Sequence, residues 1–208
     1  MDCMIQARVG STRFPNKIFS KIGGKSVLEN VVRRIKKSKK IKRVVIATSK
    51  KREDKKIVNF CKKNKILYYT GSEKRVALRL LKAAQQLKTK SFVRICADSP
   101  FINAKLVDKV IKNYENNNVD ISTNIFPRTF PKGQSVEVIR VSTLKKNITK
   151  FLKQDMEHVT TYFYKNSKKF KIFNLKLKKN LSKLNLCIDT TKDLNFLKKN
   201  LKLNKLEY

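Results

Sequence analysis

The amino-acid sequence predicts an α/β protein of three layers, in which helices cover both faces of a mostly parallel sheet. Short runs rich in β-branched residues, such as 44–48, alternate with amphipathic stretches such as 27–35, where apolar residues recur at helical spacing. The chain has 208 residues and is 40% hydrophobic, which is enough for one substantial core. Alternating strands and helices build βαβ units, and these units place helices on both faces of a parallel sheet.

The first part of the chain contains a regular succession of strands and helices. Two helix starts have capping signals, since Ser26 and Glu29 form a predicted capping box and Asn103 is a predicted N-cap. The predicted strands cover 4–7, 44–48, 66–70, 92–96 and 120–124, and the predicted helices cover 27–39, 53–63, 73–88 and 103–116.

The later part of the chain has a different character. Strands are predicted over 136–141, 170–177 and 185–188, and helices over 141–151, over 157–166 and from Thr191 onward. No linker rich in Pro, Gly or Ser separates the two parts, so one domain is expected over residues 1–208.

The composition limits the class of protein. The net charge is +36, but the excess is mainly lysine spread from Lys17 to Lys205, and Asn and Ile are also abundant. This is typical of a genome rich in A and T, and it argues against a nucleic-acid partner, whose binding surface would cluster arginine with aromatic residues. No apolar run is long enough to span a membrane and no signal peptide is evident, so we expect a cytoplasmic protein. The four cysteines form no CxxC pair and are expected to be reduced thiols.

The segment QARVGSTRFPNK, residues 6–17, follows the first predicted strand and is unusually basic. Ligands of open α/β sheets lie beyond the carboxyl ends of the strands, where this loop begins. Gly10 would let backbone amides approach an anion, while Arg8, Arg13 and Lys17 supply positive charge. The loop suits a triphosphate but contains neither GxxxxGK[ST] nor GxGxxG. An ordinary connection in a lysine-rich protein is the alternative interpretation.

Two aspartates follow predicted strands at the same edge. Asp98 comes after the strand 92–96, and Asp189 comes after the strand 185–188. Two carboxylates that converge beside a phosphate loop would hold Mg²⁺. Each could instead be a helix N-cap, because Asp189 directly precedes Thr190 and Thr191 at a predicted helix start.

The order of the motifs resembles a known family over nearly the whole chain, from Ile5 to about Leu197. The chain is similar to the cytidylyltransferases of the spore-coat polysaccharide biosynthesis type, which are relatives of the CMP-3-deoxy-manno-octulosonate and CMP-sialic acid synthetases. The first of the matching segments is the most specific, and the later ones gain weight from being collinear. These segments are IQARVGSTRFPNK, IGGKSVLENVVRRI, VVIATS, GSE, VRICADSPFI, FPRTFPKGQSVEVI, EHVTTY and LCIDTTKDL.

The resemblance implies the nucleotide-diphospho-sugar transferase fold, which is glycosyltransferase-A-like, and a nucleotidyltransferase that moves CMP from CTP to an acidic sugar with release of pyrophosphate. By similarity, residues 1–124 would form a nucleotide-binding half and residues 125–208 an acceptor and dimerisation half. A homodimer joined through residues 141–177 is expected from the relatives.

The resemblance also assigns roles to individual residues of this chain. Mg²⁺ would be held by Asp98 and Asp189, which would be catalytic together with Arg13 and Lys17. The acceptor sugar would meet Arg128, Glu137 and His158, although His158 could equally be a helix residue that orients a loop. The nucleotide would be bound by Ala7, Arg8, Gly10, Ser11, Arg13 and Lys17.

Some family acids are replaced in this chain. Lys132 and Ser135 stand in FPKGQSVEV where relatives commonly have acids, and Arg75 and Leu78 do so in GSEKRVALR. A pocket that has lost carboxylates would favour an acidic acceptor, such as a nonulosonic acid or a sugar phosphate. Two alternatives stay open: a sugar 1-phosphate nucleotidyltransferase that uses another nucleotide, and a basic nucleotide- or nucleic-acid-binding protein that has lost catalysis.

Overall fold

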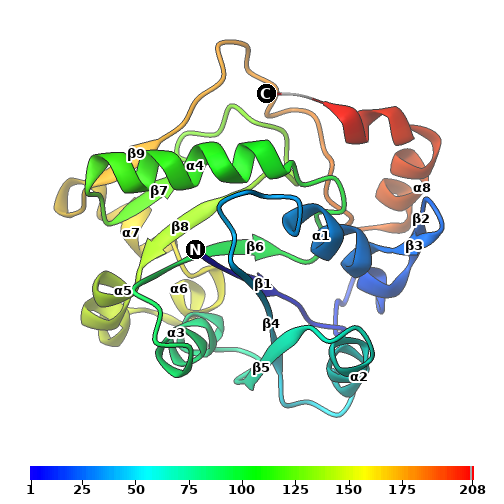
Figure 1. Cartoon of the computed structure of the whole chain (residues 1–208), viewed down its shortest axis with the longest axis horizontal. Coiled ribbons are helices and arrows are strands. Elements are labelled where there is room, and N and C mark those ends of the chain that lie inside the picture. Colours follow the sequence, from blue (N-terminus) through cyan, green and yellow to red (C-terminus); the bar gives the residue numbers. More distant parts are fainter. Residues whose placement is uncertain (207) are drawn as a thin grey trace.

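A computed structural model describes residues 1–206 and 208, and it confirms three layers around a mostly parallel sheet (Figure 1). Within the seven-stranded sheet, β8 alone runs antiparallel to its neighbours β6 and β7. The strands lie in the order β5 (Leu67–Gly71), β4 (Arg43–Ser49), β1 (Asp2–Gln6), β6 (Ser91–Cys96), β8 (Glu137–Arg140), β7 (Ile121–Thr123) and β9 (Ile172–Asn174).

The register of the parallel strands places several connecting loops together. Gln6 at the end of β1 pairs with Ala47 of β4 on one side and with Cys96 of β6 on the other. The carboxyl ends of these strands therefore lie at one edge of the sheet, which we call the carboxyl edge. The loops that leave β1 and β6 start there side by side.

Helices cover both faces of the sheet, and side chains alternate between the two cores. Cys3 and Ile5 of β1 face the core under α1 (Val27–Ile35), α2 (Lys55–Lys63) and α4 (Ala104–Asn117). Met4 faces the core under α3 (Val76–Gln86), α5 (Val141–Asn147), α6 (Lys153–His158) and α7 (Thr161–Lys165). This alternation is the period of two that a strand imposes on its side chains.

A smaller third core joins the two ends of the chain. Ile22 of the hairpin β2 (Lys21–Ile22) and β3 (Lys25–Ser26) packs with Leu194 and Leu197 of α8 (Thr191–Lys199). Figure 1 shows α8, in red, beside this blue hairpin. Short 3-10 helices also occur in the described residues: η1 (Lys17–Phe19), η2 (Ile148–Lys150), η3 (Ser167–Lys169) and η4 (Leu201–Lys205).

Both predicted helix caps form. Oγ of Ser26 accepts a hydrogen bond from the Glu29 amide at 3.1 Å, and Oδ1 of Asn103 accepts one from the Leu106 amide at 3.0 Å. The carboxylate of Glu29 pairs with Lys25 at 3.0 Å, which is not the reciprocal bond that a capping box predicts. The first helix also ends at Ile35, four residues before the predicted end at 39.

Three predictions for the later part of the chain are corrected. The helix predicted over 157–166 is interrupted at Val159, whose φ of 61° is incompatible with a right-handed helix. Residues 185–188 form no strand and make only one isolated parallel bridge, between Lys132 and Asn185. The strand predicted over 170–177 shrinks to the three residues of β9.

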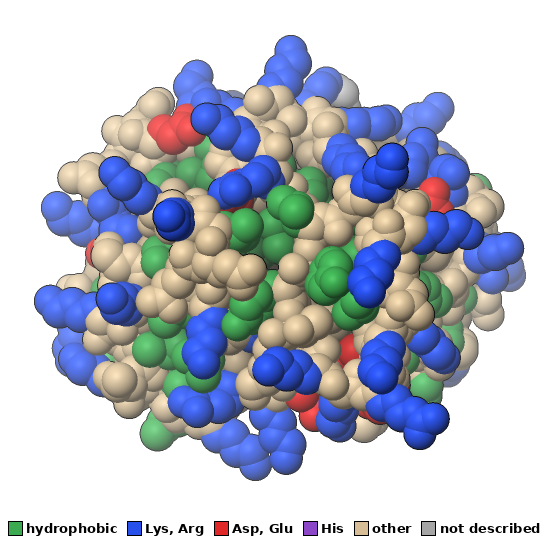
Figure 2. Space-filling model, turned by 60° about the horizontal axis from the view of Figure 1, so that its bottom comes forward, with side chains coloured by type: hydrophobic (Ala, Val, Ile, Leu, Met, Phe, Trp, Pro, Cys, Tyr) green, Lys and Arg blue, Asp and Glu red, His purple; other side chains and the backbone are tan. Residues whose placement is uncertain are grey.

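Positive side chains are distributed over the surface. On the face shown in Figure 2, Lys and Arg are scattered and do not gather in a single patch. Within residues 1–206 and 208, no helix is both long and apolar enough to cross a bilayer. All four cysteines are free.

Candidate active site

A cavity of about 230 Å³ opens at the carboxyl edge, between the loops that follow β1 and β6. The loop after β1, residues 7–17, contributes Arg8, Ser11, Arg13 and Lys17 to its lining. We call this segment the first loop. The segment after β6 adds Asp98. The cavity therefore unites the basic loop with one of the two aspartates singled out in the sequence.

The second aspartate lies in the same place. Nζ of Lys17 is 3.0 Å from Oδ2 of Asp98 and 2.8 Å from Oδ1 of Asp189, and Arg13 is 3.2 Å from the same Asp189 oxygen. Because both carboxylates contact one ammonium group, they converge on a single point in the cavity. This convergence agrees with the interpretation that the two aspartates act together.

Lys17 is the most enclosed charge of this group, with 11% of its side chain exposed. Burial alone would lower the pKa of its ammonium group, but the charge of Asp98 and hydrogen bonds to both carboxylates outweigh that effect and raise the pKa. Lys17 is consequently a permanent cation at neutral pH. Residues 17–19 form η1, and this turn directs Lys17 inward from the first loop.

A chain of backbone contacts brings Asp189 to Asp98. The amide of Lys132 donates to the Leu184 carbonyl at 3.0 Å, and the Leu186 amide donates back to the Lys132 carbonyl at 2.9 Å. The Ile188 amide then donates to the Asp98 carbonyl at 2.9 Å. These bonds replace the predicted late strand as the means of fixing Asp189.

Gly133 makes this contact possible. Its φ is +87°, and a Cβ there would lie 2.6 Å from the Leu186 backbone carbonyl. Only glycine combines a left-handed conformation with so close a backbone approach. The glycine in FPKGQ is therefore required because the segment that carries Asp189 passes too close for a side chain at this position.

Asp189 is not the N-cap of the following helix. Thr190 caps α8, because its Oγ1 accepts from the Asp193 amide at 3.2 Å, and Asp193 completes the capping box. Asp193 Oδ2 also accepts from the Asp189 amide at 3.0 Å, which fixes the backbone of Asp189 while its own carboxylate faces Lys17 and Arg13. The capping alternative is thus excluded for Asp189. Asp98 bonds to Lys17 and to Ser99 Oγ.

Arg79 of α3 also lines the cavity and was not predicted from the sequence. Arg79 is 3% exposed, and burial lowers the pKa of its guanidinium to about 10. One of its nitrogens donates to the Ser72 carbonyl at 2.7 Å, whereas its buried Nε has no partner. An arginine on the apolar face of a helix, in the sequence VALRLL, was the signal that could have identified it.

Glu157 and His158, at the end of α6, form another part of the lining. Glu157 is 3.4 Å from the guanidinium of Arg8, so that α6 and the first loop meet across the cavity. Both side chains of this pair are 47% exposed. His158 is thus the one predicted acceptor residue that the structure places at the cavity.

Three other predicted site residues lie away from the lining. Gly10 is exposed beside Glu53. Arg128 donates to the Pro131 carbonyl and to Ser135 Oγ, within its own turn. Glu137 is 2% exposed and bonds to Arg94, Thr160 and Tyr164, so its carboxylate has no free face for a sugar.

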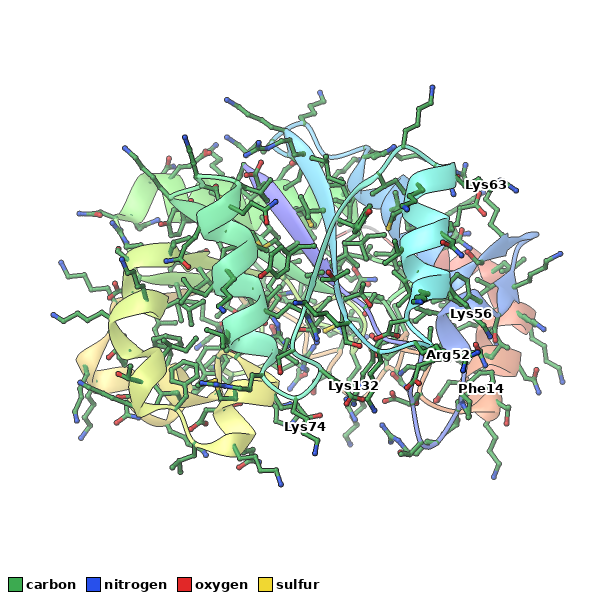
Figure 3. All side chains as sticks on the ribbon, turned by 90° about the horizontal axis from the view of Figure 1, so that it is seen from below. Phe14, Arg52, Lys56, Lys63, Lys74 and Lys132 are labelled. Carbon is green, nitrogen blue, oxygen red and sulfur yellow. The ribbon has the colours of Figure 1, made fainter. Side chains whose placement is uncertain are left out.

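Further cations lie toward this edge. Figure 3 shows Arg52, Lys74 and Lys132 toward the same edge of the molecule, in the lower part of the view, while Lys63 lies at the far end of α2. Lys56 joins α2 to the first loop, because its Nζ donates to Asn16 Oδ1 at 3.3 Å. Positive charge around the cavity would attract polyanionic substrates.

The donor set at the cavity suits a hard cation. Two carboxylates converge there, and Mg²⁺ is typically bound by one or two carboxylates together with waters and substrate phosphates. In the described residues no group of three or more His, Cys, Asp and Glu side chains could hold a metal ion, and Mg²⁺ does not require such a group.

Comparison with known proteins gives a consistent result. The family model described as "Cytidylyltransferase" matches residues 3–208. The spore coat polysaccharide biosynthesis protein SpsF of Bacillus subtilis is 30% identical over 203 residues, covering 94% of this chain and 83% of that protein. An uncharacterised protein of Methanocaldococcus jannaschii is 37% identical over 196 residues, covering 91% and 78%.

Solved structures agree in fold. A cytidylyltransferase from Leptospira borgpetersenii superposes with a TM-score of 0.93 at 32% identity, covering 100% of this chain and 90% of that one. A CMP-2-keto-3-deoxy-manno-octonic acid synthetase complexed with CTP superposes with a TM-score of 0.69 at 16% identity and covers 99% of both chains. The second likeness concerns the fold alone.

Proposed function

Because this chain belongs to the cytidylyltransferase family, and is therefore a nucleotidyltransferase, we propose that it transfers CMP from CTP to an acidic sugar and releases pyrophosphate. The product would be an activated sugar for a surface polysaccharide or another glycan. The observation that carries the proposal is the meeting of Arg13, Lys17, Asp98 and Asp189 in one cavity at the carboxyl edge.

The proposed chemistry depends mainly on positioning and charge. An oxygen of the acceptor forms a bond to the α-phosphorus while the bond from that phosphorus to the pyrophosphate oxygen breaks, and an attacking hydroxyl releases its proton to solvent. Arg13 and Lys17 would offset the negative charge that grows on the departing pyrophosphate, and Arg8 would bind phosphate oxygens at the outer end of the loop. Buried cations such as Lys17 are effective here because the surroundings screen them little.

The two aspartates would hold Mg²⁺. When bound, this ion would neutralise phosphate charge and help to orient the reacting oxygens. Asp98 and Asp189 would turn from Lys17 toward the ion, and Lys17 would then be free to bind the triphosphate.

An acidic acceptor is supported by charge. The acids that relatives commonly carry are replaced by Arg75, Leu78, Lys132 and Ser135, and Arg75 and Lys132 are exposed. Relatives named 3-deoxy-manno-octulosonate cytidylyltransferase match different shares of this chain: the one from Thermodesulfovibrio yellowstonii covers 58% at 31% identity, and the one from Wigglesworthia glossinidia brevipalpis covers 79% at 27% identity. A carboxylate or phosphate on the sugar would meet this positive surface favourably.

We also propose that the protein works as a homodimer joined through residues 141–177. Leu152, in this segment, is 70% exposed, an unusual exposure for a large apolar side chain. Light scattering of the purified chain would test this: a monomeric mass at micromolar concentration would reject the dimer.

Pyrophosphate release tests the proposed reaction. CTP, GTP, UTP, dTTP and ATP would be tested separately with Mg²⁺ against acidic sugars, sugar 1-phosphates and neutral sugars. Asp98→Asn would be compared with Asp108→Asn, which replaces a carboxylate that bonds to Ser38 outside the cavity. We expect release with CTP and an acidic sugar, lost in the first variant and retained in the second.

Other outcomes would redirect the assignment. Release with a different nucleotide and a sugar 1-phosphate would establish the alternative nucleotidyltransferase. Neutral sugars that react best would reject the acidic acceptor. No release with any nucleotide from a folded protein, together with polyanion binding that weakens steeply with salt, would favour the non-catalytic alternative.

A further inference from the structure

A buried cluster behind the cavity centres on Glu137 of β8. Its Oε1 accepts hydrogen bonds from Thr160 Oγ1 at 2.6 Å and from the Tyr164 hydroxyl at 2.7 Å. Its Oε2 accepts a bond from the guanidinium of Arg94 on β6, the residue directly opposite in the sheet. Glu137 is 2% exposed, and its partners Thr160 and Arg94 are buried as well.

The cluster joins the sheet to a segment of two short helices. Arg94 is held in turn by Gln6 at the end of β1, because its Nε donates to Gln6 Oε1 at 2.8 Å. Thr160 and Tyr164 belong to the segment formed by α6 and α7, which have six and five residues. Helices this short have little stability of their own, so tertiary contacts must fix their position.

The junction of these two helices is strained. Val159 has a φ of 61° and a ψ of −57°, yet its side chain is fully buried in the core. A β-branched residue at positive φ is unfavourable and persists only where the surroundings impose it. The next residue, Thr160, is the one bonded to Glu137, and the two preceding residues, Glu157 and His158, line the cavity.

We propose that Glu137 is a positioning residue: its buried carboxylate, paired with Arg94, holds the turn at 157–160 so that Glu157 and His158 line the acceptor end of the cavity. Glu137 acts through Thr160 and does not touch the sugar. This inference rests on the proposed function for the identity of the substrates. The position of the turn can be measured without any substrate.

The test removes single hydroxyls and leaves every charge paired. Thr160→Val removes the hydroxyl that donates to Glu137 at 2.6 Å, with a longer contact of 3.4 Å to the His158 carbonyl, and keeps the side-chain shape. Thr160→Ser restores the hydroxyl. The matched control is Thr143→Val, since Thr143 Oγ1 donates to Asp120 Oδ1 at 2.6 Å and lies outside the cavity lining. Glu137→Gln is less suitable, because it would leave the Arg94 charge unpaired in the core.

Amide hydrogen exchange gives the first readout. We expect peptides covering 157–162 to exchange about tenfold faster in Thr160→Val, the size of effect that one lost hydrogen bond produces. Thr160→Ser should restore slow exchange, and Thr143→Val should leave this segment unchanged. Equal exchange of 157–162 in the wild type and in Thr160→Val would overturn the proposal, as would an equal acceleration in Thr143→Val.

Kinetics give the second readout, using pyrophosphate release from CTP with whichever acidic sugar reacts. We expect Thr160→Val to raise KM for the acceptor several-fold while the Kd of CTP, measured by calorimetry without acceptor, changes less than about twofold. A change confined to CTP affinity would reject the assignment to the acceptor end. If no acceptor reacts, the proposed function fails, and the exchange experiment still decides whether Glu137 holds the turn.

Discussion

The ammonium nitrogen of Lys17 lies 3.0 Å from Oδ2 of Asp98, a residue that follows the neighbouring strand of the sheet. The same nitrogen is 2.8 Å from Asp189, so a single ammonium group from the first loop contacts both carboxylates of the cavity. Without it, two like charges would face each other in a partly enclosed space, and their repulsion would destabilise the site.

Replacing Lys17 should therefore affect both activity and stability. Lys17→Met should lower kcat/KM for CTP by about 100- to 1,000-fold, the loss typical of one charge-stabilising group. It should also lower the melting temperature, and millimolar Mg²⁺ should recover part of this loss by taking the place of the cation. Thermal melts with and without Mg²⁺ would measure both effects.

Lys25→Met is the matched control for this variant. Lys25 pairs with Glu29 on the surface, with 40% of its side chain exposed, and such pairs contribute little. Its melting temperature should not respond to Mg²⁺ differently from the wild type. An equal response in both variants would show that Mg²⁺ acts elsewhere.

Gly133 should be intolerant of substitution. Gly133→Ala would combine a positive φ with a Cβ 2.6 Å from the Leu186 carbonyl, which would push away the segment that carries Asp189. We expect a loss of pyrophosphate release together with a melting temperature several degrees lower. Gly24→Ala provides the comparison, since φ is 76° there but no atom lies within 4 Å of the added Cβ. Should both variants lose stability and activity equally, backbone strain alone would account for the effect.

The parts of the fold that depend on local patterns could be predicted from the sequence. Ser26 and Asn103 cap their helices as expected, because a cap involves only residues three apart in the chain. Asp98 and Lys17 could be placed together since both follow central parallel strands. The carboxylate of Glu29, the predicted capping-box acceptor, pairs instead with the nearby Lys25, and the motif alone does not reveal this competition.

The remaining features depend on contacts between distant segments. The 184–188 segment is fixed by hydrogen bonds to Lys132 and Asp98, which are both distant in sequence. Its alternating apolar residues alone therefore predicted a strand. Glu137 appeared in a motif typical of a sugar site, but its neighbours Arg94, Thr160 and Tyr164 are brought around it only by the tertiary fold. The break at Val159 is imposed in the same way.

The stability of the α8 start should depend on acid pH. Burial would raise the pKa of Asp193, but bonds from the Thr190 hydroxyl and from the amides of Asp189 and Thr190 outweigh it and lower the pKa below its usual 3.8. The stabilisation is therefore fully present above pH 3.8 and is lost as the pH falls through the lower folded-state value. Asp193→Asn should cost about 1 kcal/mol at pH 6 and less at pH 3, measured by urea unfolding. A difference that stays constant between these two pH values would contradict this.

The cysteine thiols should be unreactive in the folded protein. Burial raises the pKa of Cys61 and of Cys96 to about 12, and it raises the pKa of Cys3 and Cys187 as well. Since the thiolate is the reactive form, an aromatic disulfide reagent at pH 8 should react slowly with native protein and rapidly after unfolding in urea. Rapid reaction of the native thiols would contradict this prediction.

Arg79 should contribute to nucleotide affinity, because its partnerless Nε lies on a buried side chain that lines the cavity. Arg79→Lys keeps a positive charge but removes the planar donors, and we expect the Kd of CTP to rise about tenfold or more, as for lost hydrogen bonds to a charged group. Arg75→Lys, which replaces an exposed arginine one turn earlier, is the control and should bind CTP as the wild type does.

Calorimetry with CTP, UTP and GTP would then show which part of the nucleotide Arg79 contacts. If all three nucleotides lose affinity equally, Arg79 binds phosphates; if CTP loses most, it recognises the base. An unchanged Kd in a variant that melts normally would show that Arg79 serves only to hold the Ser72 carbonyl.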